Sequence, residues 1–191
     1  MEADREIEIG GESPVIESHW PGFVDLRLHP ERASQLSEAA ALPALAEALE
    51  VLNSATSPVW TSKCDVWPVV DLAGLDSDEL DAPPGFATHA ISGYIDLLPR
   101  NQRKWDLPAK AAADCKDLCS LLHAVPLPCC RVDLVARQAI VNSVAQTAAS
   151  MELGITAYIS ACGRTHAEAA ATFQSVLAGF ACILSAPSTP E

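Results

Sequence analysis

The sequence predicts an α+β fold: a ferredoxin-like β-α-β-β-α-β core with an added strand and a C-terminal helix. Two kinds of pattern lead to this prediction. Five segments alternate apolar and polar residues, or are rich in β-branched and aromatic residues, as strands are. Three longer segments repeat apolar residues at three- and four-residue steps, as helices do. Their order predicts helices packed on one face of a mainly antiparallel sheet.

The predicted strands are residues 23–28, 59–70, 88–98, 130–141 and 153–161. In the first, Val24, Leu26 and Leu28 lie on one side and the intervening residues on the other. Pro30 and Pro99 follow the first and third strands, and a proline ends a strand because it has no backbone N–H to donate. Within the second, period two predicts that Trp60 and Trp67 point to opposite faces.

The predicted helices are residues 31–55, in one or two pieces, residues 107–125, and a last helix that begins at Thr165. Thr165 and Glu168 have the spacing of a capping box. The core stripe of the last helix is Ala170, Phe173, Leu177, Phe180 and Leu184. Its other side is small and uncharged, so we expect a cover there from the N-terminal arm, another element or a second subunit. The sequence therefore predicts a homodimer with this helix or the sheet face in the contact.

The chain divides into three parts by composition. Residues 1–18 are acidic and interrupted by Gly and Pro, which predicts a mobile acidic N-terminal arm. Residues 19–186 form a single domain with a front half (19–70), an acidic Pro/Gly linker (71–85) and a back half (86–186). Residues 187–191 are expected to be a frayed tail.

Charge and cysteine content exclude several classes of protein. The 191 residues include 12 Lys and Arg against 25 Asp and Glu, a net charge of -13, which disfavours nucleic-acid and anionic membrane partners. The apolar window near 166–184 includes His166 and Glu168 and is not a plausible membrane span. Seven cysteines without a leader-like N-terminus predict a cytoplasmic protein with reduced thiols.

Charged residues of both signs lie on the polar sides of the predicted strands. The pattern nominates Arg27, Lys63, Asp65, Arg131 and Arg137 for ligand binding, with Asp25, Asp96 and Asp133 on the same sides. If these sides share one sheet face, three interpretations stay open. The face is a solvated surface with cross-strand pairs, a polar dimer interface, or the floor of a site for a charged small molecule.

The candidates for catalysis are Cys162, Asp96 and Asp133. Cys162 comes where a strand passes into a helix N-terminus, a place that lowers a thiol's pKa. Asp96 and Asp133 are alternatives as acid and base, with Arg131 and Arg137 holding an anionic substrate. The common nucleotide, metalloprotease and hydrolase fingerprints are absent from the sequence, so no cofactor is expected.

One helix carries residues of metal-ligand type, namely Cys115, Cys119 and His123. They lie at successive four-residue steps, but no second cysteine pair has zinc-site spacing. Cys115 also fits the apolar stripe, so we expect core packing and no metal site. Taken together, the sequence predicts a non-catalytic, homo-oligomeric module that binds a small charged ligand or a partner on its sheet face. The alternative is a small enzyme that uses a Cys nucleophile or carboxylates.

Overall fold

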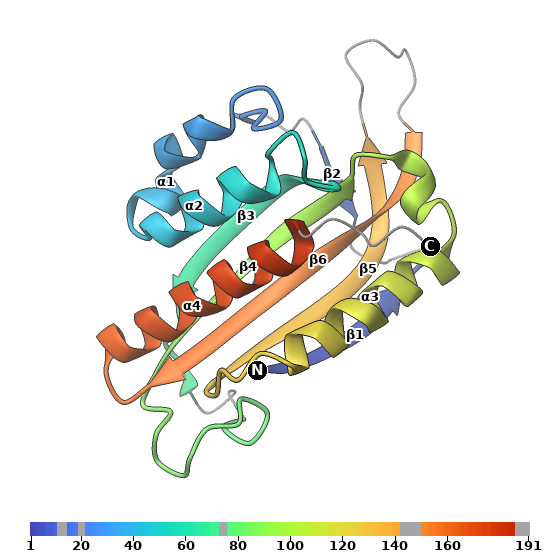
Figure 1. Ribbon diagram of the computed structural model, residues 1–191. Helices are drawn as coiled ribbons and strands as arrows, with labels where there is room; N and C mark the ends of the chain where they lie inside the picture. Colours follow the sequence, from blue (N-terminus) through green and yellow to red (C-terminus); the bar gives the residue numbers. More distant parts are fainter. Residues whose placement is uncertain (11–14, 19–21, 73–75, 142–149, 186–191) are drawn as a thin grey trace.

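The computed structural model describes residues 1–10, 15–18, 22–72, 76–141 and 150–185. It contains helices and one mixed sheet, which confirms the α+β class (Figure 1). The strands are β1 (Glu2–Glu8), β2 (Ile16–Glu17), β3 (Val59–Pro68), β4 (His89–Pro99), β5 (Cys130–Val141) and β6 (Ser150–Gly163). The α-helices are α1 (Ser37–Ala40), α2 (Pro43–Leu52), α3 (Pro108–His123) and α4 (His166–Ser185), and short 3₁₀ helices span Pro30–Gln35 and Gln102–Trp105.

The order of strands in the sheet is β1-β5-β6-β4-β3, with β2 also paired to β5. The β3–β4, β4–β6 and β5–β6 pairs are antiparallel, whereas β1 and β2 run parallel to β5. Because β4 and β5 are both antiparallel to β6, they are parallel to each other. Helix α3 therefore connects two parallel strands that have β6 between them, a split β-α-β unit. The ferredoxin-like topology as a whole is not confirmed, because no strand forms at residues 23–28 and the edge strand β1 runs parallel to β5.

The strand predicted at residues 23–28 is not formed, which removes the first strand of the expected core. Residues 26–28 are turns, and the Asp25 side chain accepts a hydrogen bond from the Arg27 N–H at 3.0 Å. Aspartate side chains that bond the nearby backbone in this way favour turns over sheet pairing. Leu26 is buried all the same, whereas Leu28 is 73% exposed.

The prediction of an irregular N-terminal arm is wrong for Glu2–Glu8, which form the edge strand β1. Acidic residues alternate there with Met1, Ala3 and Ile7, and β1 lies parallel to β5 in register from Glu2 opposite Arg131 to Glu8 opposite Arg137. Met1 is buried in the core, and its ammonium donates a hydrogen bond to the Val125 carbonyl. The alternation of acidic and apolar residues is the pattern of a strand, but the high charge of the segment made it resemble a disordered arm. The predicted tail at 187–191 lies outside the described residues.

Helices α2, α3 and α4 pack on one face of the sheet (Figure 1). The core between the layers includes Leu45, Leu49, Ile95, Leu97, Leu134, Ile155, Phe173 and Phe180. The Thr165 hydroxyl accepts a hydrogen bond from the Glu168 N–H at 3.1 Å, as the predicted cap requires. By length and composition alone α4 is apolar enough to cross a membrane, yet its core stripe packs on this sheet, which is how a core helix of a soluble domain packs.

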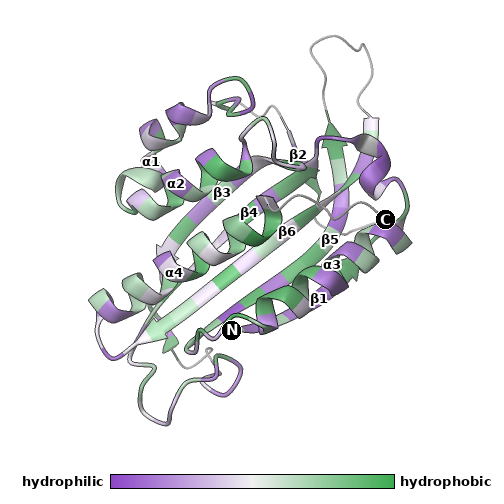
Figure 2. Cartoon of the chain, in the orientation of Figure 1, coloured by the Kyte–Doolittle hydropathy of each residue, from purple (hydrophilic) through white to green (hydrophobic). Residues whose placement is uncertain are grey.

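The outer side of α4 is exposed in the single chain. Its small residues there are Ala167, Ala171, Ser175, Ala178 and Cys182. On the viewed side α3 has long hydrophilic stretches, whereas α4 is mostly intermediate or hydrophobic, drawn pale or green (Figure 2). Among the described residues neither the N-terminal strand nor another element covers this side, and a cover by a second subunit stays a proposal.

Candidate ligand-binding face

The candidate site is the sheet face opposite the helices, here called the open face. Strand alternation assigns each residue to a face: Ile95, Leu134 and Ile155 belong to the core, so their neighbours in sequence point away from it. Two small apolar clusters cover the ends of the open face, one around Ile16, Trp60 and Leu98 and the other around Leu80, Ala90 and Cys162. Between them lie Asp4, Glu6, Glu8, Lys63, Asp65, Trp67, Ser92, Tyr94, Asp96, Arg131, Asp133, Arg137, Thr156, Tyr158 and Ser160.

Most residues nominated from sequence come together on this face. Lys63, Asp65, Asp96, Arg131, Asp133 and Arg137 all belong to it. Arg27 lies at its edge, with its guanidinium 4.1 Å from the Trp60 ring centre and 2.7 Å from an Asp25 carboxylate oxygen. The expectation of a shared charged face therefore agrees with the geometry, while its use in ligand binding stays a prediction.

A row of three aromatic rings crosses the open face, and this row was not predicted from the sequence. Ring centres are 6.3 Å apart for Trp67 and Tyr94, and 6.2 Å apart for Tyr94 and Tyr158. Trp67 is 39% exposed, and both tyrosines are half-buried. The available pattern was that Tyr94 lies two residues before Asp96, and therefore on the same side of its strand.

A bulge in β3 explains why Trp60 and Trp67 lie on the same face. The pairing of β3 with β4 shifts register between Thr61 and Cys64. One extra residue in a strand reverses the facing of everything beyond it. Trp60 and Trp67 consequently lie on the same face, and the prediction that they point to opposite faces is wrong.

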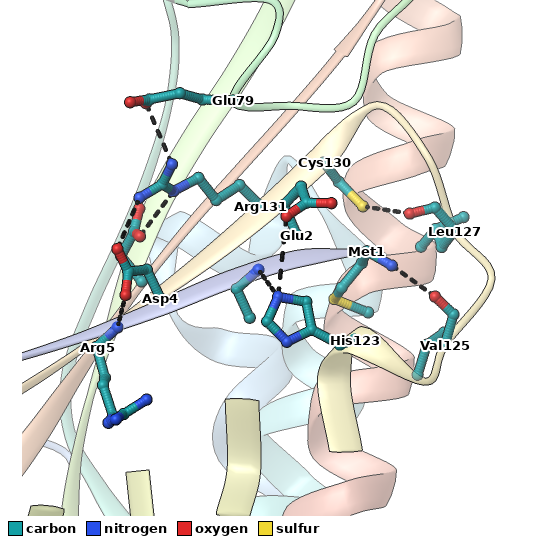
Figure 3. A network of polar contacts seen from close by, with 12 residues as sticks. Met1, Glu2, Asp4, Arg5, Glu79, His123, Val125, Leu127, Cys130 and Arg131 are labelled. Atoms are coloured by element: carbon teal, nitrogen blue, oxygen red, sulfur yellow. Dashed lines mark hydrogen bonds and ion pairs between the residues drawn. The ribbon is translucent and has the colours of Figure 1, made fainter. Parts of the chain in front are cut away.

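Arg131 and Arg137 are already paired with acidic side chains of the protein. Arg131 contacts Asp133 at 2.7 Å, Glu79 at 3.3 Å and Asp4 at 3.6 Å (Figure 3). Burial lowers the pKa of Arg131, but the hydrogen bond to Asp133 and the three carboxylates outweigh burial and raise it. Arg137 has a side chain only 11% exposed and donates to Glu8 at 2.9 Å and to the Tyr158 hydroxyl at 2.7 Å. Their charges are thus balanced without a ligand.

Asp96 lies at the centre of the open face and is 6% exposed. Its carboxylate accepts a hydrogen bond from the Thr156 hydroxyl at 2.6 Å. Burial raises the pKa of Asp96, while Thr156, Lys63 and Arg137 act in the opposite direction. Among the described residues Lys63 forms no hydrogen bond or ion pair, so this half-buried ammonium faces solvent near Asp96. The site therefore holds a buried carboxyl group beneath a cation and a tyrosine.

We expect Asp96→Asn to be more stable than the wild-type protein at neutral pH, because asparagine removes the cost of burying a charge. The pKa of Asp96 is higher in the folded protein than its ordinary value of 3.8, so folding favours the protonated form. Wild-type stability should fall as the pH rises from near 3.8 through the raised pKa. Thermal unfolding measured from acidic to neutral pH tests this expectation.

The gap between Asp96→Asn and wild type should close on acidification. Asp65→Asn, which changes an exposed carboxylate on the same face, is the matched control and should show no such closing gap. A gap that stays constant or widens at acidic pH would contradict the role assigned to burial of Asp96.

The environment of Cys162 disfavours a nucleophile. Its side chain is fully buried, and its N–H donates to the Cys129 carbonyl at 2.9 Å. Burial raises the pKa of Cys162 to about 11, with a further contribution from Cys129, so the thiol is neutral at physiological pH. Asp96 and Asp133 share the open face but lie on strands separated by β6, roughly 10 Å apart, too far for a direct carboxylate pair.

The three candidate metal ligands on α3 do not form a metal centre. Cys115 and Cys119 are buried in the core, and burial raises the pKa of Cys115 to about 12. His123 Nε2 accepts a hydrogen bond from the Ala3 N–H at 3.3 Å and lies 3.8 Å from Glu2. In the parts of the chain that the structure describes, no group of three or more His, Cys, Asp or Glu side chains is arranged to hold a metal ion.

Comparisons of the chain with known proteins add no family to this geometry. No family model, no curated protein and no solved structure matches it.

Proposed function

We propose that this protein is a binding module whose open face holds a small charged ligand or a partner. The observation that carries this proposal is the aromatic row Trp67–Tyr94–Tyr158, which leaves large rings exposed among charged groups on a sheet face that no described helix covers. Exposed aromatic residues on a rigid sheet are typical of recognition surfaces, because they contribute contact area at little cost in side-chain entropy.

Binding is favoured over catalysis by the state of the candidate reactive groups. Cys162 is a neutral, buried thiol, and the two arginines expected to hold a substrate are engaged with carboxylates. Asp96 is the one candidate whose burial and raised pKa resemble those of a general acid, and this keeps a small enzyme as the alternative.

We propose further that the module is a homo-oligomer, through the exposed side of α4. A groove of about 700 Å³ runs between α2 and α4, and its small and apolar lining residues, among them Ala44, Val51 and Ala178, are joined by the polar residues Glu47, Gln174, Ser175 and Ser185. After Glu168 the helix carries no charge, which is unusual for a solvated surface. All seven cysteines are free thiols, which supports our proposal of a cytoplasmic location.

A thermal-shift screen of the full chain against charged metabolites, amines and peptides tests the binding function. A ligand at a hundred times its Kd should stabilise the protein by about 2.7 kcal/mol. Tyr94→Leu and Lys63→Met should each change the shift, whereas Leu121→Ala on the outside of α3 should leave it unchanged. Light scattering on the same sample should report the mass of two chains, and Ala178→Glu should reduce it to that of one.

Two results would contradict these proposals. A ligand whose shift survives both open-face substitutions binds elsewhere. A wild-type mass of one chain at high protein concentration excludes the homo-oligomer but leaves the binding function standing.

A further inference from the structure

We propose that the open face recognises a partner's extended polypeptide segment that carries lysine or arginine at alternate positions. This inference rests on the proposed binding function and assigns the chemistry of its partner. The cationic side chains would lie over the exposed ring of Trp67 and the half-buried ring of Tyr94, with Asp65 beside them.

In the described part of the chain, two aromatic rings of this surface have no cation stacked over them, whereas two others already have one. The Arg27 guanidinium lies 4.1 Å from the Trp60 ring centre, and that of Arg137 lies 5.2 Å from the Tyr158 ring centre. Among the described residues no lysine or arginine lies over Trp67 or Tyr94. These faces are therefore available to a cation from outside, and aromatic faces attract cations through the ring quadrupole.

Charge complementarity supplies the second argument. The carboxylates of the open face and its margin are Asp4, Glu6, Glu8, Asp25, Asp65, Glu79, Asp96 and Asp133, whereas the cations are Arg27, Lys63, Arg131 and Arg137. The surplus is negative, as is the net charge of -13 of the chain. A field of this sign attracts basic partners and repels acidic ones.

The spacing of the rings is the third argument, and it favours an extended chain. Trp67 and Tyr94 have ring centres 6.3 Å apart. In an extended polypeptide, side chains on the same side recur every second residue, roughly 6.6 Å apart. A segment crossing from β3 to β4 would place successive same-side cations over successive rings.

The shape of the surface also favours a polypeptide over a small amine. Small-molecule sites are concave, but Trp67 and Tyr94 stand on an exposed sheet surface. A cavity of about 390 Å³ opens further along the face, and its charged lining consists of Asp4, Glu6 and Asp133 together with Arg5 and Arg131. An extended segment that crosses the sheet toward β1 reaches these carboxylates.

The test measures binding of labelled synthetic peptides of about eight residues, a length that spans roughly five strands. The first peptide alternates lysine and serine. The second has the same composition with its lysines clustered, and the third and fourth replace lysine by glutamine and by glutamate. Spermidine is titrated as a small-amine arm. Fluorescence anisotropy at low and physiological salt gives each affinity for the full chain.

We expect the alternating lysine peptide to bind more tightly than the clustered one and spermidine, and the glutamine and glutamate peptides not to bind. Tyr94→Leu and Trp67→Leu should each weaken binding about two- to fivefold, as loss of an exposed cation–π contact predicts. Asp65→Asn should weaken binding and reduce its salt dependence. Glu50→Gln, an equal change of charge at an exposed position of α2, should leave the affinity unchanged.

Equal losses for Asp65→Asn and Glu50→Gln would mean that the peptide responds only to overall charge, which overturns the inference. Stronger binding of spermidine would overturn the polypeptide assignment. Binding of the glutamate peptide that is lost in Tyr94→Leu would overturn the cationic assignment while supporting a ligand-binding open face. If no peptide binds but a charged metabolite gives a shift that depends on Tyr94, the inference fails and the proposed function holds.

Discussion

Replacing Phe173 with alanine is expected to lower the free energy of unfolding by about 3–5 kcal/mol, the cost of a large cavity in a packed core. Phe173 is 1% exposed and packs from α4 onto the sheet at Gly93. A Cβ built on Gly93 would lie 3.2 Å from the end of the Phe173 ring, so the ring lies over a position without a side chain. Few atoms can move to fill the space, which places the cost at the upper end of the range.

Urea unfolding followed by circular dichroism measures this loss. Gln174→Ala, at the next and exposed position of α4, is the control and should change stability by less than about 0.5 kcal/mol. Phe173→Leu should fall between the two. A loss below about 1 kcal/mol for Phe173→Ala would show that α4 does not pack on β4 in this way. Gly93 lies between Ser92 and Tyr94, so this packing also orients the open face.

Replacing Asn53 with alanine is expected to cost about 2–3 kcal/mol, because it leaves a buried backbone N–H without a partner. Asn53 is fully buried at the end of α2. Its amide donates to the Leu49 carbonyl at 2.8 Å and to the Thr61 hydroxyl at 2.7 Å, and its oxygen accepts from the Thr61 N–H at 3.0 Å. The side chain thereby ties α2 to the strand that carries Lys63, Asp65 and Trp67.

The matched control is Asn101→Ala. Asn101 also accepts a backbone hydrogen bond, from the Arg103 N–H at 3.1 Å, but it is exposed, so water replaces the lost bond and the expected cost is below about 1 kcal/mol. Chemical denaturation compares both variants with wild type. Equal costs for Asn53→Ala and Asn101→Ala would contradict the importance given to burial of Asn53.

Elements with a hydrophobic pattern that extends over many neighbouring residues were predictable from sequence. The apolar repeats that predicted helices at 107–125 and from Thr165 correspond to α3 and α4, and four of the five predicted strands correspond to β3, β4, β5 and β6. Two predictions failed where a side chain competed with the pattern. The Asp25 side chain accepts a hydrogen bond from the Arg27 N–H, which favours a turn over a strand. The carboxylates of β1 have the composition of a solvated arm, and only their ion pairs with arginines of β5 show that they belong to the sheet.

The sequence by itself determined which residues of β4 and β5 point away from the core, because side-chain direction alternates along a regular strand. It therefore predicted that Asp96, Arg131 and Arg137 lie on the polar sides of their strands. Only the tertiary structure decided that β6 lies between β4 and β5, that a bulge puts Trp60 on the same face as Trp67, and that Arg131 and Arg137 are already paired. These features depend on contacts between residues far apart in the chain, and the free energy of such contacts does not appear in any local pattern of residues.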